Sequence, residues 1–250
     1  MDLLQNIVHC ENVHLSLSNP HIKHPCAHNL NVYGCVSNED FSVPEPWSGD
    51  IENAIILFIC ASPIHNQNEV YPKYSWSDYI ISDFFNNRFG GGLRQWVRNH
   101  LHPLLEDGNH TKEWSRYWAE VRKRTKELLL KKDIIGGKDY AIYPLVHCKI
   151  EEKHMNQEII TECINKFFLQ MLNISNAKIV VCLGKDTGAM VRNILQIPHD
   201  INPYGPHEIG KCKRYILCAQ HPYARRVPHS LKKLLSPQAL EEMHSFLHNT

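Results

Sequence analysis

The segment that decides the fold spans residues 54–66 and reads AIILFICASPIHN. Its first seven residues, up to Cys60, are apolar, and the next six are small, constrained by proline or polar. A short continuous apolar run that ends in turn residues is typical of a strand buried on both faces of a sheet. In open α/β sheets, ligands bind beyond the carboxyl ends of such strands. The segment therefore predicts a central strand whose end forms the floor of a site.

Three further apolar runs have the same character, at residues 140–148, 177–183 (AKIVVCL) and 214–219 (RYILCA). Helical patterns lie between them. In residues 158–172 apolar side chains recur every four positions, which places them on one helical face, and a second helix is expected at residues 187–195. Buried strands that alternate with helices predict a three-layer α/β/α sandwich around a mainly parallel, four-stranded sheet.

The composition is typical of one globular domain over residues 1–250. Apolar residues make up 43% of the chain and charged residues 21%, and the net charge of +1 excludes a uniformly basic protein. Without an 18-residue apolar window or a signal-peptide pattern, the expectation is a cytoplasmic monomer that does not contact a membrane. Nine cysteines in such a protein are expected to be thiols or metal ligands rather than disulfides.

Two regions depart from the α/β pattern. Residues 1–45 are predicted to be rich in loops apart from a short helix at LLQNIVHC, so that something besides the core must order them. Residues 86–139 are predicted to form a helical, basic insert with one apolar face, made by Trp114, Trp118, Val121 and Leu128. The opposite face is basic: Arg116, Arg122, Lys123, Arg124, Lys126, Lys131 and Lys132. This face is either a solvated helix surface or a contact surface for phosphates.

Three stretches occur in an informative order. They are VPEPWSGDIENAIILFICASPIHNQN, then YPLVHCKIEEKHMNQEIITECINKFFLQMLNISNAKIVVCLG, and then AQHPYAR. This order resembles the uracil-DNA glycosylase superfamily, and most closely its iron-sulfur-containing branches. The resemblance covers residues 43–235 and leaves the insert unaccounted for. It implies the superfamily's α/β fold, DNA as the partner, and hydrolysis of the bond between deoxyribose and a flipped-out base, leaving an abasic site.

The resemblance also implies roles for individual residues. Such a reaction builds positive charge on the sugar and negative charge on the departing base, so the cleft needs an acceptor on one side and a donor on the other. His221, in the His-Pro motif, takes the donor role. The candidates for positioning or activating water are Ser62, His65, Asn66, Glu69 and Asp78. The candidates for contacting the base are Ala61, Pro63, Tyr74 and Pro144. The candidates for contacting DNA are Lys185, Arg225 and Arg226, together with Arg116, Arg122, Lys123 and Arg124 of the insert.

The sequence departs from the family pattern at three positions. Cys60 replaces the first glycine of the strand-end motif, and Ser62 stands where several branches have a carboxylate or asparagine. Pro144 lies where some uracil-reading members have an asparagine. We therefore expect a substrate other than plain uracil, such as a deaminated purine or a hypermodified cytosine in phage DNA, removed in antiviral defence. The alternatives are a nucleic-acid-binding protein without catalysis on the same fold, and an enzyme acting on free nucleosides.

Four cysteines carry the prediction of a cofactor. Cys148, at a strand end, and Cys163, on the following helix, resemble the two C-terminal ligands of the family's [4Fe-4S] cluster. The N-terminal C-x-x-C is incomplete, because Cys10 is followed at the second position by Val13. Cys26 is the favoured replacement and Cys35 the other. Two alternatives are ordinary buried thiols and a zinc site made by His21, His24, Cys26 and His28. Beyond the metal site, no small-molecule cofactor is expected.

Overall fold

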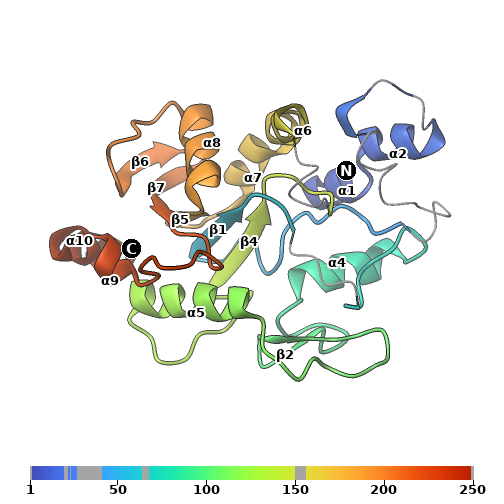
Figure 1. Ribbon diagram of the computed structural model, residues 1–250, viewed down its shortest axis with the longest axis horizontal. Helices are drawn as coiled ribbons and strands as arrows, with labels where there is room; N and C mark the ends of the chain where they lie inside the picture. The colour runs from blue at the N-terminus through green and yellow to red at the C-terminus, as the bar shows by residue number, and fades with distance from the viewer. Residues whose placement is uncertain are drawn as a thin grey trace.

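The protein is built around a five-stranded sheet in the order β4-β1-β5-β7-β6 (Figure 1). The computed structural model describes residues 2–19, 22, 24–26, 41–63, 68–149 and 156–248. The strands are β1 (Ile56–Cys60), β4 (Tyr140–Pro144), β5 (Ile179–Leu183), β6 (Tyr204–Ile209) and β7 (Cys212–Ala219). Strands β4, β1, β5 and β7 run parallel, and β6 pairs antiparallel with β7. The four predicted strands are confirmed, but the predicted number is wrong, because β6 adds a fifth.

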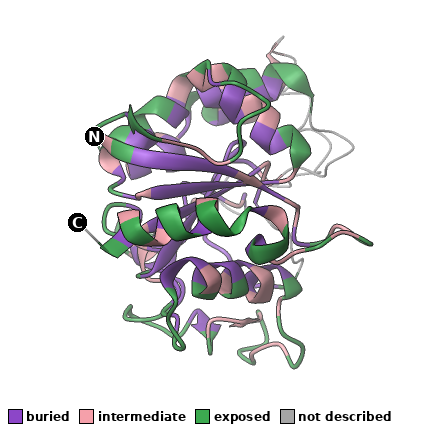
Figure 2. Cartoon of the chain, turned by 90° about the vertical axis from the view of Figure 1, so that its left-hand side faces the viewer, coloured by how far each residue is buried: buried purple, intermediate pink, exposed green. Residues whose placement is uncertain are grey.

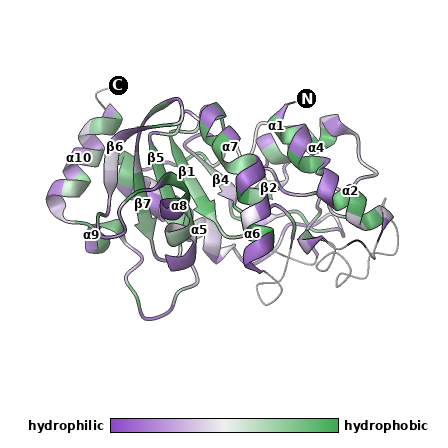
Figure 3. Ribbon diagram, turned by 90° about the horizontal axis from the view of Figure 1, so that it is seen from above, coloured by the Kyte–Doolittle hydropathy of each residue, from purple (hydrophilic) through white to green (hydrophobic). Residues whose placement is uncertain are grey.

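Helices cover both faces of this sheet (Figures 1 and 2). One side carries α6 (Gln157–Cys163), α7 (Leu169–Ile174) and α8 (Lys185–Leu195), and the other carries α5 (Arg116–Leu129), α9 (Leu231–Leu234) and α10 (Pro237–His248). Every residue of β1, β4 and β5 is buried, as the continuous apolar runs predict. Strand β6 is more hydrophilic than its neighbours and lies at the edge (Figure 3). The α/β class and the mainly parallel sheet are therefore confirmed.

The single helix expected at residues 158–172 is interrupted. Helix α6 ends at Cys163, a π-helical turn follows at Ile164–Phe168, and α7 continues to Ile174. The apolar side chains still face the core through this turn, with Phe167 and Phe168 both buried. The expected short helix near the N-terminus is confirmed as α1 (Leu3–Val8), and it is followed by α2 (Glu11–Ser18).

The insert is less helical than its sequence predicts. Residues 86–139 contain one long helix, α5, and a two-stranded hairpin of β2 (Val97–Arg98) and β3 (His102–Pro103). Most other residues of the insert form turns and loops. Helix α5 begins where the Ser115 hydroxyl accepts a hydrogen bond from the Trp118 backbone N–H at 3.4 Å. The preceding helix, α4 (Asp78–Asn86), leads into the insert.

Two side chains of the insert point the opposite way from the prediction. Arg124, expected on the basic outer face, is completely buried, and its guanidinium donates to the backbone oxygen of His229 at 3.2 Å. Its position on α5 faces the C-terminal segment that packs over this helix, which the α5 periodicity alone does not reveal. Trp114, expected on the inner face, is 67% exposed because α5 begins only after it, at Arg116. Among the described residues, no helix is long and apolar enough to cross a membrane.

Candidate functional site

The ends of four parallel strands bring two predicted motifs to one edge of the sheet. Cys60 at the end of β1 is level with Pro144 of β4, and Leu183 of β5 is level with Ala219 of β7. Backbone hydrogen bonds continue beyond the strands, from Val146 N to Ala61 O at 2.9 Å and from Gly184 N to Ala219 O at 2.8 Å. The turn after β1 and the His-Pro loop after β7 therefore lie at the same edge, with only β5 between their strands.

The last residue of β1 holds the turn that follows the strand. The Cys60 thiol donates to the backbone oxygen of Ser62 at 3.4 Å, and burial raises the pKa of this thiol to about 12, so that it stays protonated at neutral pH. Ala61 and Ser62 are half-buried, and Pro63 is buried. Two further predicted residues of this turn, His65 and Asn66, lie outside the described residues.

His221 lies in the loop after β7 and is partly exposed. The backbone N–H of Tyr223 donates to its Nδ1 at 3.3 Å. When Nδ1 accepts a hydrogen bond, the neutral ring carries its proton on Nε2, which makes Nε2 a donor. The His221 side chain lies beside Gly184, where the φ of +105° favours glycine; a Cβ there would lie at an ordinary contact distance of 3.7 Å from the Cβ of His221.

A residue of the insert also reaches the His-Pro loop. The ring of Tyr117, in the first turn of α5, lies 6.1 Å from the ring of His221 and 6.2 Å from that of Tyr223. Tyr117 is buried, and its hydroxyl lies beside the Cys60 thiol with no other hydrogen-bonding partner among the described residues. Burial, and next the charge of Cys60, raise its pKa well above the ordinary range. Sequence reasoning missed Tyr117, because only contacts between distant segments place it here.

Behind this edge lies a buried cluster of charged side chains. Arg88 donates from Nη1 to Glu45 at 3.2 Å and from Nη2 to Glu69 at 2.5 Å, and all three residues are buried. The Glu45 carboxylate also accepts hydrogen bonds from Tyr71 and Ser48, each at 3.0 Å. Glu69, a candidate for activating water, is therefore held in an ion pair. Glu45, within the quoted VPEPWSGD stretch, was not singled out from the sequence.

The backbone around Glu45 connects this cluster to β4. The backbone N–H of Glu45 donates to the oxygen of His147 at 2.8 Å, and His147 Nδ1 donates to the oxygen of Glu45 at 2.7 Å. Burial lowers the pKa of His147 to about 4, so the ring is neutral at neutral pH. The charge of Glu45 also contributes to raising the pKa of both Cys60 and Tyr117, after the larger effect of burial.

Two other predicted site residues contact the N-terminal helices. Asp78 begins α4, and its carboxylate pairs with His9 at 2.8 Å. The Tyr74 hydroxyl donates to the backbone oxygen of Val8 at 2.9 Å, and its ring stacks on Phe41 with 6.1 Å between centroids. These contacts give both side chains a role in attaching the N-terminal region. Pro144, a candidate for contacting the base, is buried as the last residue of β4.

The predicted DNA-contacting cations divide into two groups. Arg124 is buried, and Arg122 is half-buried and donates to the backbone oxygen of Ile134 at 2.8 Å. The others are exposed: Arg116, Lys123, Lys185, Arg225 and Arg226. Within this second group, Arg116 precedes Tyr117 and lies close enough to Tyr223 to lower its pKa, against the larger effect of burial.

The four cysteines of the predicted cluster are all buried and influence one another. Burial and the neighbouring thiols raise the pKa of Cys26 to about 12, the largest contribution from a thiol being that of Cys163 and the next that of Cys10. The pKa of Cys148 is raised well above the ordinary range by burial and then by the thiols of Cys163, Cys26 and Cys10. These sulfurs come from four separate segments. These four neighbouring thiols are the groups that would hold the predicted cluster.

Among the described residues, no group of three or more His, Cys, Asp or Glu side chains lies close enough to hold one metal ion. A single zinc ion requires thiolates about 2.3 Å from a common centre, whereas a four-iron cluster spaces its ligands more widely. For the zinc alternative, His24 Nδ1 accepts a hydrogen bond from the Cys26 backbone N–H at 3.1 Å, and His21 and His28 lie outside the described residues.

A scan against models of protein families gives no match for this sequence, and a search among curated proteins finds no similar chain.

Proposed function

We propose that the protein is a monofunctional DNA glycosylase that removes a modified base from DNA and leaves an abasic site. One observation carries the proposal. The turn at Ser62 and the loop at His221 lie at the same edge of the sheet, and the favoured tautomer of His221 makes its Nε2 a donor. The motif resemblance gives the reaction type, and the shared sheet edge supports it, because ligands of open α/β sheets bind beyond the carboxyl ends of the strands.

The proposed mechanism separates charge between these two sides. As the N-glycosidic bond breaks, the departing base gains negative charge, and His221 Nε2–H donates a hydrogen bond to it. The sugar gains positive charge, and the Ser62 hydroxyl orients the attacking water. The Cys60 thiol does not act as a nucleophile, because burial keeps it protonated. Glu45 takes no direct part, because its carboxylate is occupied by Arg88, Tyr71 and Ser48.

The pocket residues favour a base other than plain uracil. Pro144 has no side-chain donor or acceptor with which to read a pyrimidine edge. A deaminated purine and a hypermodified cytosine of phage DNA remain the two substrate classes to separate, the second of which would place the enzyme in antiviral defence.

In this proposal a [4Fe-4S] cluster is held by Cys10, Cys26, Cys148 and Cys163. The cluster would supply a covalent attachment between the N-terminal region and the β4–α6 region, as structural metal sites do. Three observations support this role. The four thiols are buried, they raise one another's pKa, and both regions contribute two of them.

Base release identified by mass tests the function. The substrates are labelled duplexes containing uracil, hypoxanthine or glucosylated hydroxymethylcytosine, with an unmodified duplex as control. We expect release of a modified base, an intact but alkali-labile strand, and no covalent adduct with borohydride. His221→Gln should reduce release by about 100-fold or more while leaving DNA binding unchanged. Absence of release from every duplex contradicts the proposal.

The second candidate function is nucleic-acid binding without catalysis. It is favoured by the occupation of Glu45 and Glu69 by Arg88, which leaves neither carboxylate available to activate water. A protein of this kind would bind the duplexes above with equal affinity, whatever the base, and His221→Gln would change nothing that the assay measures.

A further inference from the structure

Trp114 is exposed where tryptophan is normally buried. Three of the five tryptophans, Trp47, Trp96 and Trp118, are buried, and Trp76 is half-buried. Trp114 is 67% exposed, and its ring lies between the β2–β3 hairpin and the start of α5. An exposed indole is a large apolar surface in contact with water, and it is informative here because it lines a groove together with cationic side chains.

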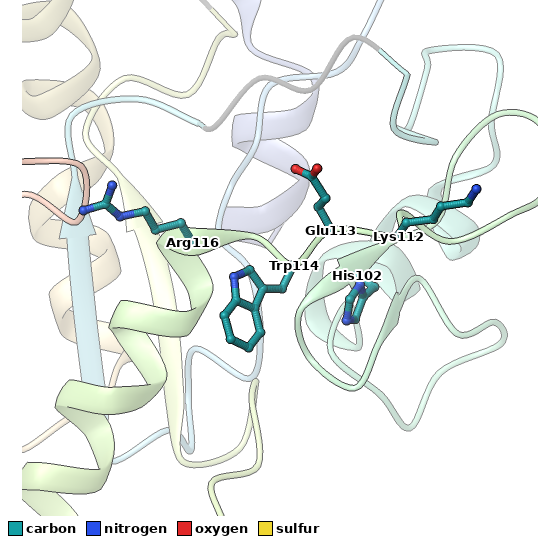
Figure 4. A pocket seen from close by; sticks show the side chains of 5 residues that line it. All are labelled: His102, Lys112, Glu113, Trp114 and Arg116. Atoms are coloured by element: carbon teal, nitrogen blue, oxygen red, sulfur yellow. The ribbon is translucent and has the colours of Figure 1, made fainter.

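This indole lines an open groove of about 450 Å³ (Figure 4). The other residues that line the groove are His102, Lys112, Glu113 and Arg116. In Figure 4 the rings of Trp114 and His102 lie on the same side of the segment that connects them, while the Glu113 carboxylate points to the opposite side. A volume of this size is in the range of small-molecule and nucleotide sites.

Backbone hydrogen bonds hold the walls of the groove in place. Thr111 N donates to Pro103 O at 3.0 Å, and Ser115 N donates to Leu101 O at 2.9 Å, so the segment before α5 is tied to the hairpin at both ends. The Thr111 hydroxyl donates to Glu113 O at 2.9 Å. His102 Nδ1 donates to Thr111 O at 2.9 Å, which fixes the orientation of its ring. The Trp114 side chain is therefore presented from an ordered segment.

The charges around the groove are mainly positive. Lys112 and Arg116 flank Trp114, and Arg98 is directly opposite His102 in the hairpin, which places both side chains on the same face. Glu113 is the one acidic residue that lines the groove, and it points away from the Trp114 ring. An aromatic surface bordered by cations suits a nucleotide, whose base stacks and whose phosphate is paired.

We propose that this groove binds an unpaired nucleotide of a DNA strand, with its base stacked on Trp114 and the adjoining phosphates on Lys112 and Arg116. The position follows from α5: Tyr117, one turn beyond Trp114, contacts His221. A strand bound in the groove would have its adjoining nucleotides near the start of α5, where Tyr117 contacts His221. The inference rests on the proposed function for its substrate, DNA, and it adds a single-stranded subsite beside the cleft.

Affinity for a short, fluorescently labelled oligothymidylate, measured by anisotropy, tests the subsite without any base release. We expect Trp114→Ala to weaken binding by about tenfold and Trp114→Phe to retain most of the affinity, because stacking needs an aromatic face. The double variant Lys112→Ala/Arg116→Ala should lower the salt slope by about one for each phosphate that is no longer paired with a cation. Leu169→Ala, which removes a similarly exposed apolar side chain on α7, is the control and should bind normally.

Several results would overturn the proposal. One is equal affinity of Trp114→Ala and the unchanged protein. Another is displacement of the oligonucleotide by polyglutamate with the same dependence on Trp114, which would assign the groove to an acidic protein partner. Failure of the proposed function is seen separately, because binding of the oligothymidylate is measured without base release, so its dependence on Trp114 can hold even if no duplex releases a base.

Discussion

At the scale of single residues, Arg88 determines the charge balance behind the sheet edge. Its guanidinium pairs with two buried carboxylates, Glu45 and Glu69, and lies 5.0 Å from the centroid of the Phe84 ring. Burial opposes the charge of Arg88, but the two carboxylates outweigh burial and raise its pKa, so the guanidinium is charged at neutral pH. Glu45 in turn influences Cys60 and Tyr117 at the candidate site.

Replacing Arg88 with methionine should therefore be strongly destabilising. The substitution removes the cation that pairs with both buried carboxylates and leaves Lys149 as a neighbouring cation. We expect the free energy of unfolding to fall by about 3–5 kcal/mol. Urea denaturation followed by circular dichroism measures the change. The matched control is Arg88→Met/Glu45→Gln/Glu69→Gln, which removes all three charges and should recover a large part of the stability. A single variant as stable as the original protein would show that the carboxylates are not buried as described.

At the scale of elements, the strands were predictable where burial is complete on both faces. Strands β1, β4, β5 and β7 appear in the sequence as continuous apolar runs, because both faces are covered by helices. Strand β6 was missed, since Tyr204–Ile209 contains glycine, proline and exposed polar residues and lies at the sheet edge. The helical content of the insert was overestimated as well. The helical periodicity holds only from Arg116 onward, where α5 begins.

The contact between α8 and β7 provides a test of packing. Gly188, inside α8, faces Cys218, and a Cβ at Gly188 would lie 2.8 Å from the Cys218 sulfur. Alanine is favoured over glycine in a helix by about 1 kcal/mol. The overlap costs about 1–3 kcal/mol, which outweighs that gain. We therefore expect Gly188→Ala to lower the midpoint of thermal unfolding.

The sulfur can be removed to check the cause. In a Cys218→Ala background the overlap is relieved, so adding Gly188→Ala should leave stability unchanged or raise it. The four proteins form a double-mutant cycle, and the coupling between the two positions is the quantity to measure. Additive effects would show that the α8–β7 contact is looser than described.

At the scale of the whole molecule, the sequence order predicted the sheet edge but not everything that gathers there. The turn at Ser62 and the loop at His221 could be paired in advance, because parallel strands end at the same edge. Tyr117 and Glu45 could not, since they come from the insert and from the segment before β1 and arrive only through tertiary packing. Tyr74 and Asp78, expected in the site, instead contact the N-terminal helices.

The last prediction concerns the N-terminal region, in which α1 and α2 are separated from β1 by a long segment. Cys10 and Cys26 lie in this region, while Cys148 lies in the loop after β4, which ends at Pro144 rather than at Cys148 as predicted, and Cys163 is the last residue of α6. If a cluster joins the four thiols, removing one ligand should release iron and loosen the whole region. We expect Cys26→Ser, purified anaerobically, to lose its brown colour and most of its iron, and to become sensitive to proteases within residues 1–45.

Cys182→Ser, which changes a buried cysteine in β5, is the control and should keep both its iron and its protection from proteases. Loss of iron in Cys35→Ser but not in Cys26→Ser would transfer the ligand role to Cys35. Anaerobic protein that is colourless and contains stoichiometric zinc would replace the cluster with a zinc site.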